Sequence, residues 1–254
     1  MLKCLIKKAI PFGVVEWYKA RKAGQHEFKK NFFSLSKSLE DGGRFVCQWK
    51  DRYPCLADNI TYTPFEPHYT YHPAWGARIL AATRPEVHVD ISSSLSFVTI
   101  VSAFIPIEFY DFRPAHLHLN NLTSKSVNIL SLPFDSNSLP SISCMHVVEH
   151  IGLGRYGDPH DPQGDIKAMQ ELQRVVAPNG QLLFVVPVAG KSMIQYNAHR
   201  IYLYNDIVGQ FPKMDLKSFS LITDDGKFLE NADQNEVSNQ KWGCGCFHFI
   251  KRGC

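Results

Sequence analysis

The chain has 254 residues, of which 44% are hydrophobic, and carries a formal net charge of +3. This length and composition suffice for one large core, so we expect one domain with an N-terminal extension. The seven cysteines are odd in number and scattered, which disfavours a disulfide framework and favours a reducing cytoplasm. No run approaches the roughly 20 apolar residues that span a bilayer, and no signal-peptide pattern begins the chain, so we expect a cytoplasmic protein.

Positive charge is concentrated in the expected extension, residues 1–43. Residues 1–30 contain eight Lys or Arg and two Glu, a net charge of +6, which leaves −3 for the remaining residues. Apolar residues recur at helical spacing before Pro11, namely Leu2, Leu5, Ile6, Ala9 and Ile10. Such a segment either packs on its own domain or rests on an anionic membrane surface at the inner face of the membrane. A nucleic-acid partner is not expected, since no basic and aromatic stripe recurs.

Residues 44–254 are expected to form the α/β domain. Its first part, 44–73, is rich in Cys, Trp, Tyr and Pro and has little helical periodicity, so we interpret it as an ordered segment that covers one end of a sheet. A helix is predicted to begin at Pro73 and to end at Arg84, before Pro85.

Short apolar runs alternate with helical patterns from residue 87 onward. Strands are expected over 87–91, 107–110, 126–130, 141–147, 181–186, 216–222 and 246–250. Helices are expected over 95–104, 165–177 and 204–211. The last two strands have no clear helix between them, so we expect them to pair antiparallel. The pattern predicts a doubly wound, mostly parallel, seven-stranded sheet.

Several motifs carry a resemblance to known proteins. The segments LPFDSNS, SCMHVVEHI and ELQRVVAPNGQLLFVVPV resemble the class I S-adenosylmethionine-dependent methyltransferases, over residues 87 to 250. More narrowly, VDISSS, ISCMHVVEHIGLGRYGDPHDPQGD, NAHRIY and GCGCF resemble an uncharacterised bacterial family of methyltransferase-like proteins associated with surface-polysaccharide genes. The resemblance implies a Rossmann-like fold, S-adenosylmethionine as the cofactor and methyl transfer as the activity.

The resemblance also implies where the cofactor lies, at the ends of the first three strands. The family has a glycine-rich loop after the first strand, whereas this chain has Asp90, an isoleucine and three serines, of which Ser92 and Ser94 are expected to contact the cofactor. Asp111 follows the second strand, where the family binds ribose hydroxyls, and Asn128 stands where the family contacts adenine. The alternative is that these side chains are ordinary cap, strand-end and turn residues.

Candidate catalytic residues follow the fourth and fifth strands. His146, Glu149 and His150 have a spacing that a helical turn would bring to one side, where an imidazole serves as a general base for O-methylation. The same three residues suit a metal site less well, and a purely structural turn is the main alternative. His199 is the second candidate base, and no metal ligand set is expected.

Two basic residues and a tyrosine are expected to contact the substrate. Arg155 and Tyr156 lie in the polar insertion 152–164, which suits a loop over the mouth of an active site. Arg200 follows His199 and suits a phosphate or carboxylate group. The pair Cys244 and Cys246 offers at most two ligands, so we interpret it as core packing.

The combined interpretation is a methyltransferase that O-methylates a sugar in surface-glycan biosynthesis. Its substrate would be a glycan or a nucleotide-linked or lipid-linked sugar. The alternative is a non-catalytic, methyltransferase-like binding or assembly protein, because the serine loop departs from the glycine-rich pattern.

Overall fold

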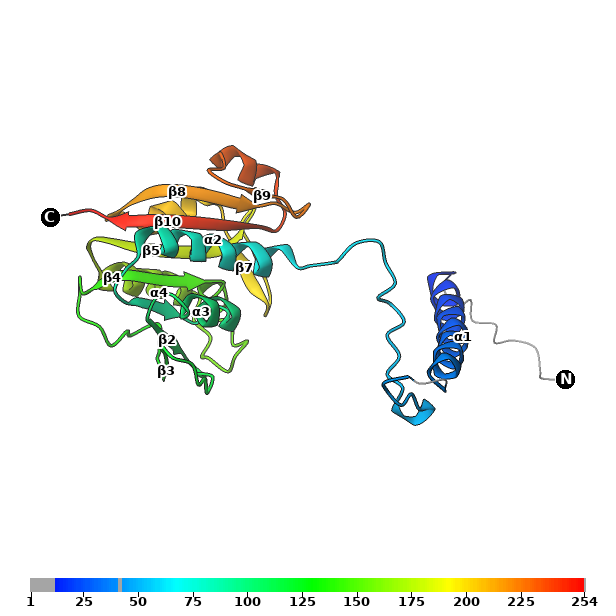
Figure 1. The fold of residues 1–254 in the computed structure, drawn as a ribbon. Helices are drawn as coiled ribbons and strands as arrows, with labels where there is room; N and C mark the ends of the chain where they lie inside the picture. The colour runs from blue at the N-terminus through cyan, green and yellow to red at the C-terminus, as the bar shows by residue number, and fades with distance from the viewer. Residues whose placement is uncertain (1–11, 41–42, 254) are drawn as a thin grey trace. The chain divides into compact units, whose positions relative to one another are not determined.

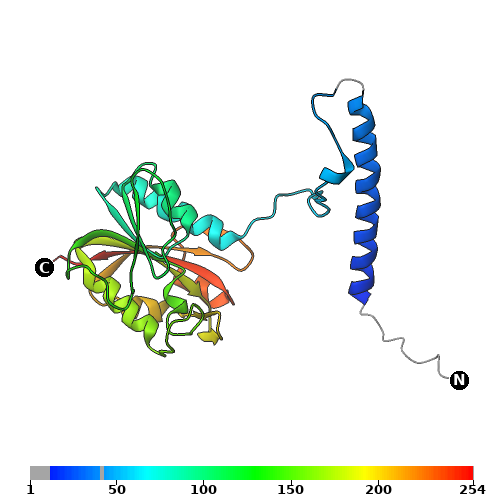
Figure 2. The same ribbon diagram turned by 90° about the horizontal axis from the view of Figure 1, so that it is seen from below.

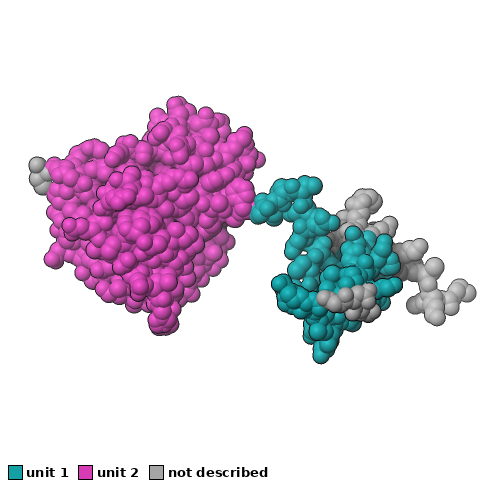
Figure 3. Space-filling view, in the orientation of Figure 1, with its two compact units in different colours: residues 1–64 teal, residues 65–254 magenta. Residues whose placement is uncertain are grey.

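The computed structural model describes residues 12–40 and 43–253, which divide into two compact units, 1–64 and 65–254 (Figures 1 and 3). The segment 44–73 is thereby divided, since residues 44–64 belong to the first unit and only 65–73 to the second. The predicted apolar helix of residues 2–10 lies outside the described residues. In the described ranges, no helix has both the length and the apolar character needed to cross a bilayer.

The first unit contains one long helix, α1 (Phe12–Glu40), and a short 3-10 helix, η1 (Trp49–Asp51). The Trp49 ring lies with its centroid 4.9 Å from that of Phe32 and 5.6 Å from that of Phe33. This aromatic contact joins the chain after α1 to the C-terminal half of the helix.

The second unit is built on an eight-stranded sheet of order β3-β2-β1-β4-β5-β10-β8-β9. The strands are β1 (His88–Ile91), β2 (Ile107–Asp111), β3 (Leu122–Ser126), β4 (Leu139–Met145), β5 (Val176–Val188), β8 (Met214–Ile222), β9 (Phe228–Leu229) and β10 (Gly243–Lys251). Strands β1 to β5 pair in parallel, and β10 is antiparallel to both β5 and β8. The predicted doubly wound sheet is confirmed, and the two-residue β9 accounts for the extra strand. A separate ribbon joins β6 (Met193–Gln195) to β7 (His199–Ile201).

Helices cover both faces of this sheet (Figure 2). They are α2 (Pro67–Thr83), α3 (Leu95–Val101), α4 (Gly164–Val175) and α5 (Tyr204–Gln210), with short 3-10 helices η2 (Val148–His150) and η3 (Gln234–Asn239). Side chains of β10 alternate between two cores: Cys244 and Cys246 pack with α2 and α3, whereas Phe247 and Phe249 pack with α4 and α5. Both cysteines are buried in the core, as expected.

Two predicted elements are displaced. Helix α2 begins at Pro67 rather than at Pro73, because the side chain of Glu66 accepts a hydrogen bond from the Tyr69 N–H and Pro67 occupies the first turn. The third strand ends at Ser126 rather than beginning there, so Asn128 lies two residues beyond it. The earlier start of α2 places His68 and His72 inside the helix.

Candidate functional site

A cavity of about 340 Å³ opens beyond the carboxyl ends of β1, β2, β3 and β4. The segment at or just after the end of each of these strands contributes at least one residue to its wall. Six of the residues singled out from the sequence line it: Ser92, Asp111, Asn128, His146, His150 and Tyr156. Ligands of parallel α/β sheets bind at this edge, and the volume lies at the lower end of the range for small-molecule sites.

Ser92 makes the tight turn after β1. Its backbone has φ +57°, in the left-handed region that favours glycine, and its N–H donates to the Tyr110 carbonyl. The backbone at Ser92 therefore has a conformation that glycine usually adopts. Ser94 does not line the cavity, because it caps α3 by accepting a hydrogen bond from the Phe97 N–H.

Asp90 lies beneath the cavity wall. Its carboxylate is fully buried and accepts hydrogen bonds from the Ser93 N–H and the Ser143 hydroxyl. Burial raises the pKa of Asp90 to about 6. Ser93 in turn accepts a hydrogen bond from the Met145 N–H, so Asp90 ties the loop after β1 to β4. It is a positioning residue and not part of the cavity surface.

Asp111 and Asn128 both use one side-chain oxygen to form their own turns. Asp111 Oδ1 accepts from the Arg113 N–H at 2.7 Å, and Asn128 Oδ1 accepts from the Leu130 N–H at 3.0 Å. Both residues still line the cavity. The wall beside them is apolar and includes Phe112, Val127, Ile129 and Leu130.

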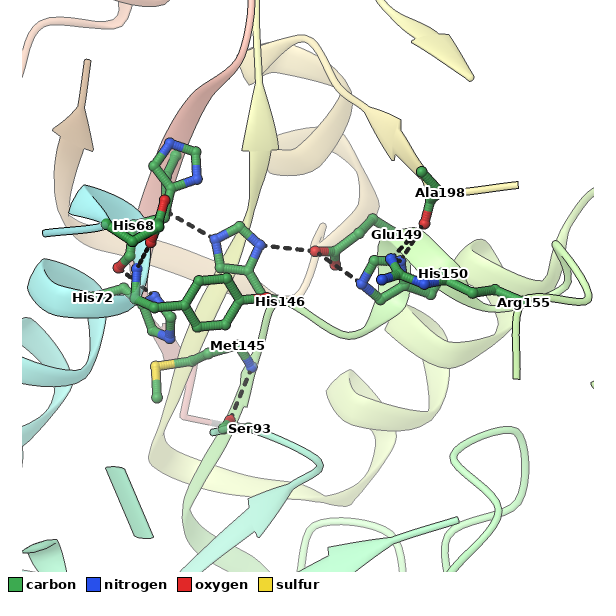
Figure 4. Close-up of polar contacts among 12 residues, drawn as sticks. His68, His72, Ser93, Met145, His146, Glu149, His150, Arg155 and Ala198 are labelled. Carbon is green, nitrogen blue, oxygen red and sulfur yellow. Dashed lines mark hydrogen bonds and ion pairs between the residues drawn. The ribbon is translucent and has the colours of Figure 1, made fainter. Parts of the chain in front are cut away.

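His146 and Glu149 form a buried pair after β4, as Figure 4 shows. His146 Nδ1 donates to Glu149 Oε1 at 2.8 Å, and this hydrogen bond lowers the pKa of Glu149 against the effect of burial. The other nitrogen, Nε2, lies 3.3 Å from Cys244 Sγ. Since both ring nitrogens contact protein groups, His146 is a poor candidate for the catalytic base.

His150 fits a general base better. Its Nδ1 donates to the Ala198 carbonyl at 2.6 Å, which leaves the lone pair on Nε2. Burial lowers the pKa of His150, so the ring is neutral at pH 7. Nε2 lies 3.8 Å from Glu149 Oε1, too far for a hydrogen bond.

The insertion after η2 forms part of the cavity wall. Asp158 accepts hydrogen bonds from the Gly152 and Tyr156 N–H groups, and it lines the cavity together with Tyr156. The guanidinium carbons of Arg113 and Arg155 lie 4.8 Å and 5.1 Å from the centre of the Tyr156 ring. Two cations therefore flank an aromatic side chain at the cavity.

His199 and Arg200 are not among the cavity-lining residues. The His199 ring stacks on Trp242 with centroids 6.0 Å apart, and burial lowers its pKa. Arg200 is buried, pairs with Asp165 at 3.6 Å and donates to the Ile151 carbonyl at 2.7 Å. The expected substrate contact of Arg200 is corrected accordingly: its guanidinium holds the insertion against α4.

Several wall residues escaped the sequence analysis. They are Phe112, Arg113, Val127, Ile129, Leu130, Val147, Ile151, Asp158 and Pro159. Most of them flank a residue that the sequence did indicate. Their position next to a polar residue at the end of a strand was therefore the signal in the sequence that could have located them.

Comparison with known proteins supports the architecture. The N-methyltransferase NodS of Bradyrhizobium japonicum superimposes with a TM-score of 0.50 at 11% identity, covering 74% of this chain and 98% of NodS. A candidate methyltransferase of Bacillus halodurans gives 0.50 at 13% identity over 71% and 98% of the two chains. A candidate sarcosine dimethylglycine methyltransferase of Galdieria sulphuraria gives 0.50 at 16% identity over 72% and 86%. The fold is that of the class I methyltransferases.

Comparison of the sequence alone matches a shorter part of the chain. Residues 131–213 match a family described as Caenorhabditis protein of unknown function, DUF268. No curated protein sequence compared with the chain matches it. The match begins at the LPF motif and ends after α5, so it contains η2, the insertion, α4 and the second part of the loop after β3, but not the loops after β1 and β2.

Proposed function

We propose that residues 65–254 form an S-adenosylmethionine-dependent methyltransferase that methylates a hydroxyl of a sugar in surface-glycan biosynthesis. The observation that carries the proposal is the single cavity into which the residues after β1, β2, β3 and β4 converge. The class I methyltransferase fold supports the reaction type. The sugar acceptor rests on the family resemblance of the motifs around the insertion.

The polar and apolar residues of the cavity wall match the polar and flat apolar parts of S-adenosylmethionine. Asp111 offers carboxylate oxygens to the ribose hydroxyls, and Asn128 offers its amide to the adenine. The apolar residues Phe112, Ile129 and Leu130 supply surface for a flat base. Ser92 brings a backbone turn of the glycine type to the cavity, so the chain path needed for close approach is retained.

The bound cofactor would supply the methyl group, and this chain would supply position and proton removal. His150 holds a lone pair on Nε2 at the cavity wall, so it accepts the proton of the attacking hydroxyl. Its lowered pKa keeps it neutral at pH 7, and the rate should fall as acid protonates the ring, at a pH below the pKa of an ordinary histidine. Arg113 lines the cavity beside Tyr156 and suits an anionic sugar carrier, such as a diphosphate. Arg155 does not line the cavity: it lies over the Tyr156 ring and donates to the Ala198 carbonyl at 3.0 Å.

The test is methyl transfer by the full chain from methyl-labelled S-adenosylmethionine to nucleotide-linked and lipid-linked sugars. We expect label in the acceptor, and His150→Gln should lower the turnover about 100-fold, the lower limit for loss of a general base. His160→Gln is the matched control, because His160 is an exposed histidine of the same insertion.

Two outcomes would count against the proposal. Binding of S-adenosylhomocysteine without transfer to any sugar would favour a binding or assembly protein that keeps the cofactor site. Equal turnover of the two histidine variants would remove His150 from its proposed role.

A further inference from the structure

Four buried side chains with metal-binding atoms lie close together. They are His146 and three others, which lie on the side of the His146 ring away from Glu149. His68 and His72 come from α2 at an i, i+4 spacing, His146 follows β4, and Cys244 lies on β10. One ligand atom from each of His68, His146 and Cys244 lies within 4.8 Å of the other two. The ring of His72 is centred 5.1 Å from that of His146.

The orientation of His146 is fixed by a carboxylate. Glu149 Oε1 accepts the Nδ1–H of His146 (Figure 4), so the lone pair is on Nε2. This nitrogen lies 3.3 Å from Cys244 Sγ. A histidine that binds a metal through one nitrogen commonly donates the other N–H to a carboxylate or a carbonyl. His72 shows the same pattern, since its Nδ1 donates to the His68 carbonyl at 2.7 Å.

Two nitrogens of this cluster have no partner among the described residues. They are Nδ1 of His68 and Nε2 of His72, and their side chains are 3% and 0% exposed. Leaving a buried polar atom without a partner destabilises the folded protein. A simple hydrogen bond between His146 and Cys244 would explain that pair but would leave both α2 histidines unexplained.

We propose that His68, His146 and Cys244 bind one Zn²⁺ ion, with His72, one helical turn along α2 from His68, as the fourth ligand. Zinc bonds of about 2.1 Å to nitrogen and 2.3 Å to sulfur place tetrahedral N and S ligands about 3.6 Å apart. The His146 to Cys244 distance of 3.3 Å is already close to this value, and the other separations within the three-residue set are at most 4.8 Å. Imidazole and thiolate together favour zinc or another late transition metal over Mg²⁺ or Ca²⁺.

The two α2 histidines are in a suitable protonation state for such an ion, whereas Cys244 must lose its proton when the ion binds. Burial lowers the pKa of His68 to about 4 and lowers that of His72, so both rings are neutral and carry a free lone pair at pH 7. Burial raises the pKa of the Cys244 thiol, so the metal would displace its proton to solvent. The ion would join α2 to the central strands at one side of the cavity wall.

The test is a Co²⁺ titration of the full chain after treatment with a chelator, followed by competition with Zn²⁺. We expect one equivalent per chain, a thiolate-to-cobalt charge-transfer band, and displacement of cobalt by zinc. Cys244→Ala should abolish the band and weaken cobalt binding at least 100-fold. Cys246→Ala is the matched control, because Cys246 is equally buried on the same face of β10 but lies outside the three-residue set.

Absence of a band in the folded protein, or an equal band in the two cysteine variants, would overturn the proposal. Circular dichroism of each variant checks that it is folded, and His68→Gln provides a second variant that spares β10. Loss of cobalt binding in His68→Gln is expected, and retention of full affinity there would equally contradict the site. Metal binding is measured without S-adenosylmethionine, so its outcome is independent of the proposed methyl transfer.

Discussion

Asp111 is the side chain on which the proposed cofactor site depends most. Asp111→Asn keeps the shape of the residue and its turn to Arg113 but removes the charge and one strong acceptor. A hydrogen bond to a charged group is worth about 1.5–3 kcal/mol, so the Kd for S-adenosylhomocysteine should rise at least 10-fold in calorimetry.

Glu108→Gln is the control for this measurement. Glu108 lies on the same strand, where it accepts a hydrogen bond from the Tyr110 hydroxyl and pairs with Lys125 at 3.6 Å, and it does not line the cavity. We expect its affinity to match that of the natural chain. An equal loss of affinity in both variants would show that strand β2, and not the Asp111 carboxylate, is responsible.

The backbone conformation of Ser92 is unfavourable for a serine, because its φ lies in the left-handed region. This region disfavours residues other than glycine by about 1–2 kcal/mol, and the greater freedom of glycine in the unfolded chain offsets part of that. Ser92→Gly should therefore raise the free energy of unfolding by about 0.5–1 kcal/mol in urea denaturation. Ser92→Val should lower it, since a β-branched residue tolerates this conformation least. A destabilised glycine variant would refute this account of the turn.

The polar residues at strand ends could be predicted from the sequence because they follow short, strongly apolar runs. Asp111 and Ser92 were located in this way, and both line the cavity. His68 could not be connected with Cys244, since they lie at opposite ends of the unit's sequence and meet only through the packing of α2 on β10. A single sequence gives no signal for such a long-range contact.

At the level of elements, a buried ion pair joins β7 to α4 and an exposed ion pair joins the insertion to α4. Arg200 and Asp165 form the buried pair at 3.6 Å, whereas Lys167 and Asp161 form a largely exposed pair. Removing one partner of a buried pair leaves an uncompensated charge, so Arg200→Met should cost about 3 kcal/mol of unfolding free energy. Lys167→Met should cost less than about 1 kcal/mol. Equal losses in urea denaturation would contradict the structural role of Arg200.

Two other elements show what the sequence pattern can and cannot indicate. The LPF motif, residues 132–134, is in contact with α4. Arg174 donates to the Leu132 and Phe134 carbonyls and pairs with Glu171 on the same helix. The third strand was misplaced because β3 is an edge strand with mostly exposed side chains. Buried Val127 and Ile129, which follow it, imitate the alternation of a strand.

At the scale of the whole molecule, the basic N-terminal segment and the cavity belong to different compact units. The net charge of +6 in residues 1–30 predicts binding to anionic vesicles, at about 1 kcal/mol for each basic residue near the surface. In liposome flotation, the full chain should float with phosphatidylserine-containing vesicles, and a chain lacking residues 1–30 should stay at the bottom. Vesicles of phosphatidylcholine alone are the control, and identical behaviour of both chains would refute membrane binding by this segment.

The central claim is that the edge of the sheet beyond β1 to β4 binds S-adenosylmethionine. Calorimetric titration of the intact, folded chain with S-adenosylhomocysteine tests it most directly, because product binding needs no knowledge of the acceptor. The account predicts one site per chain, with an affinity that falls in Asp111→Asn and persists in Glu108→Gln. No heat of binding from folded protein at millimolar ligand would contradict it.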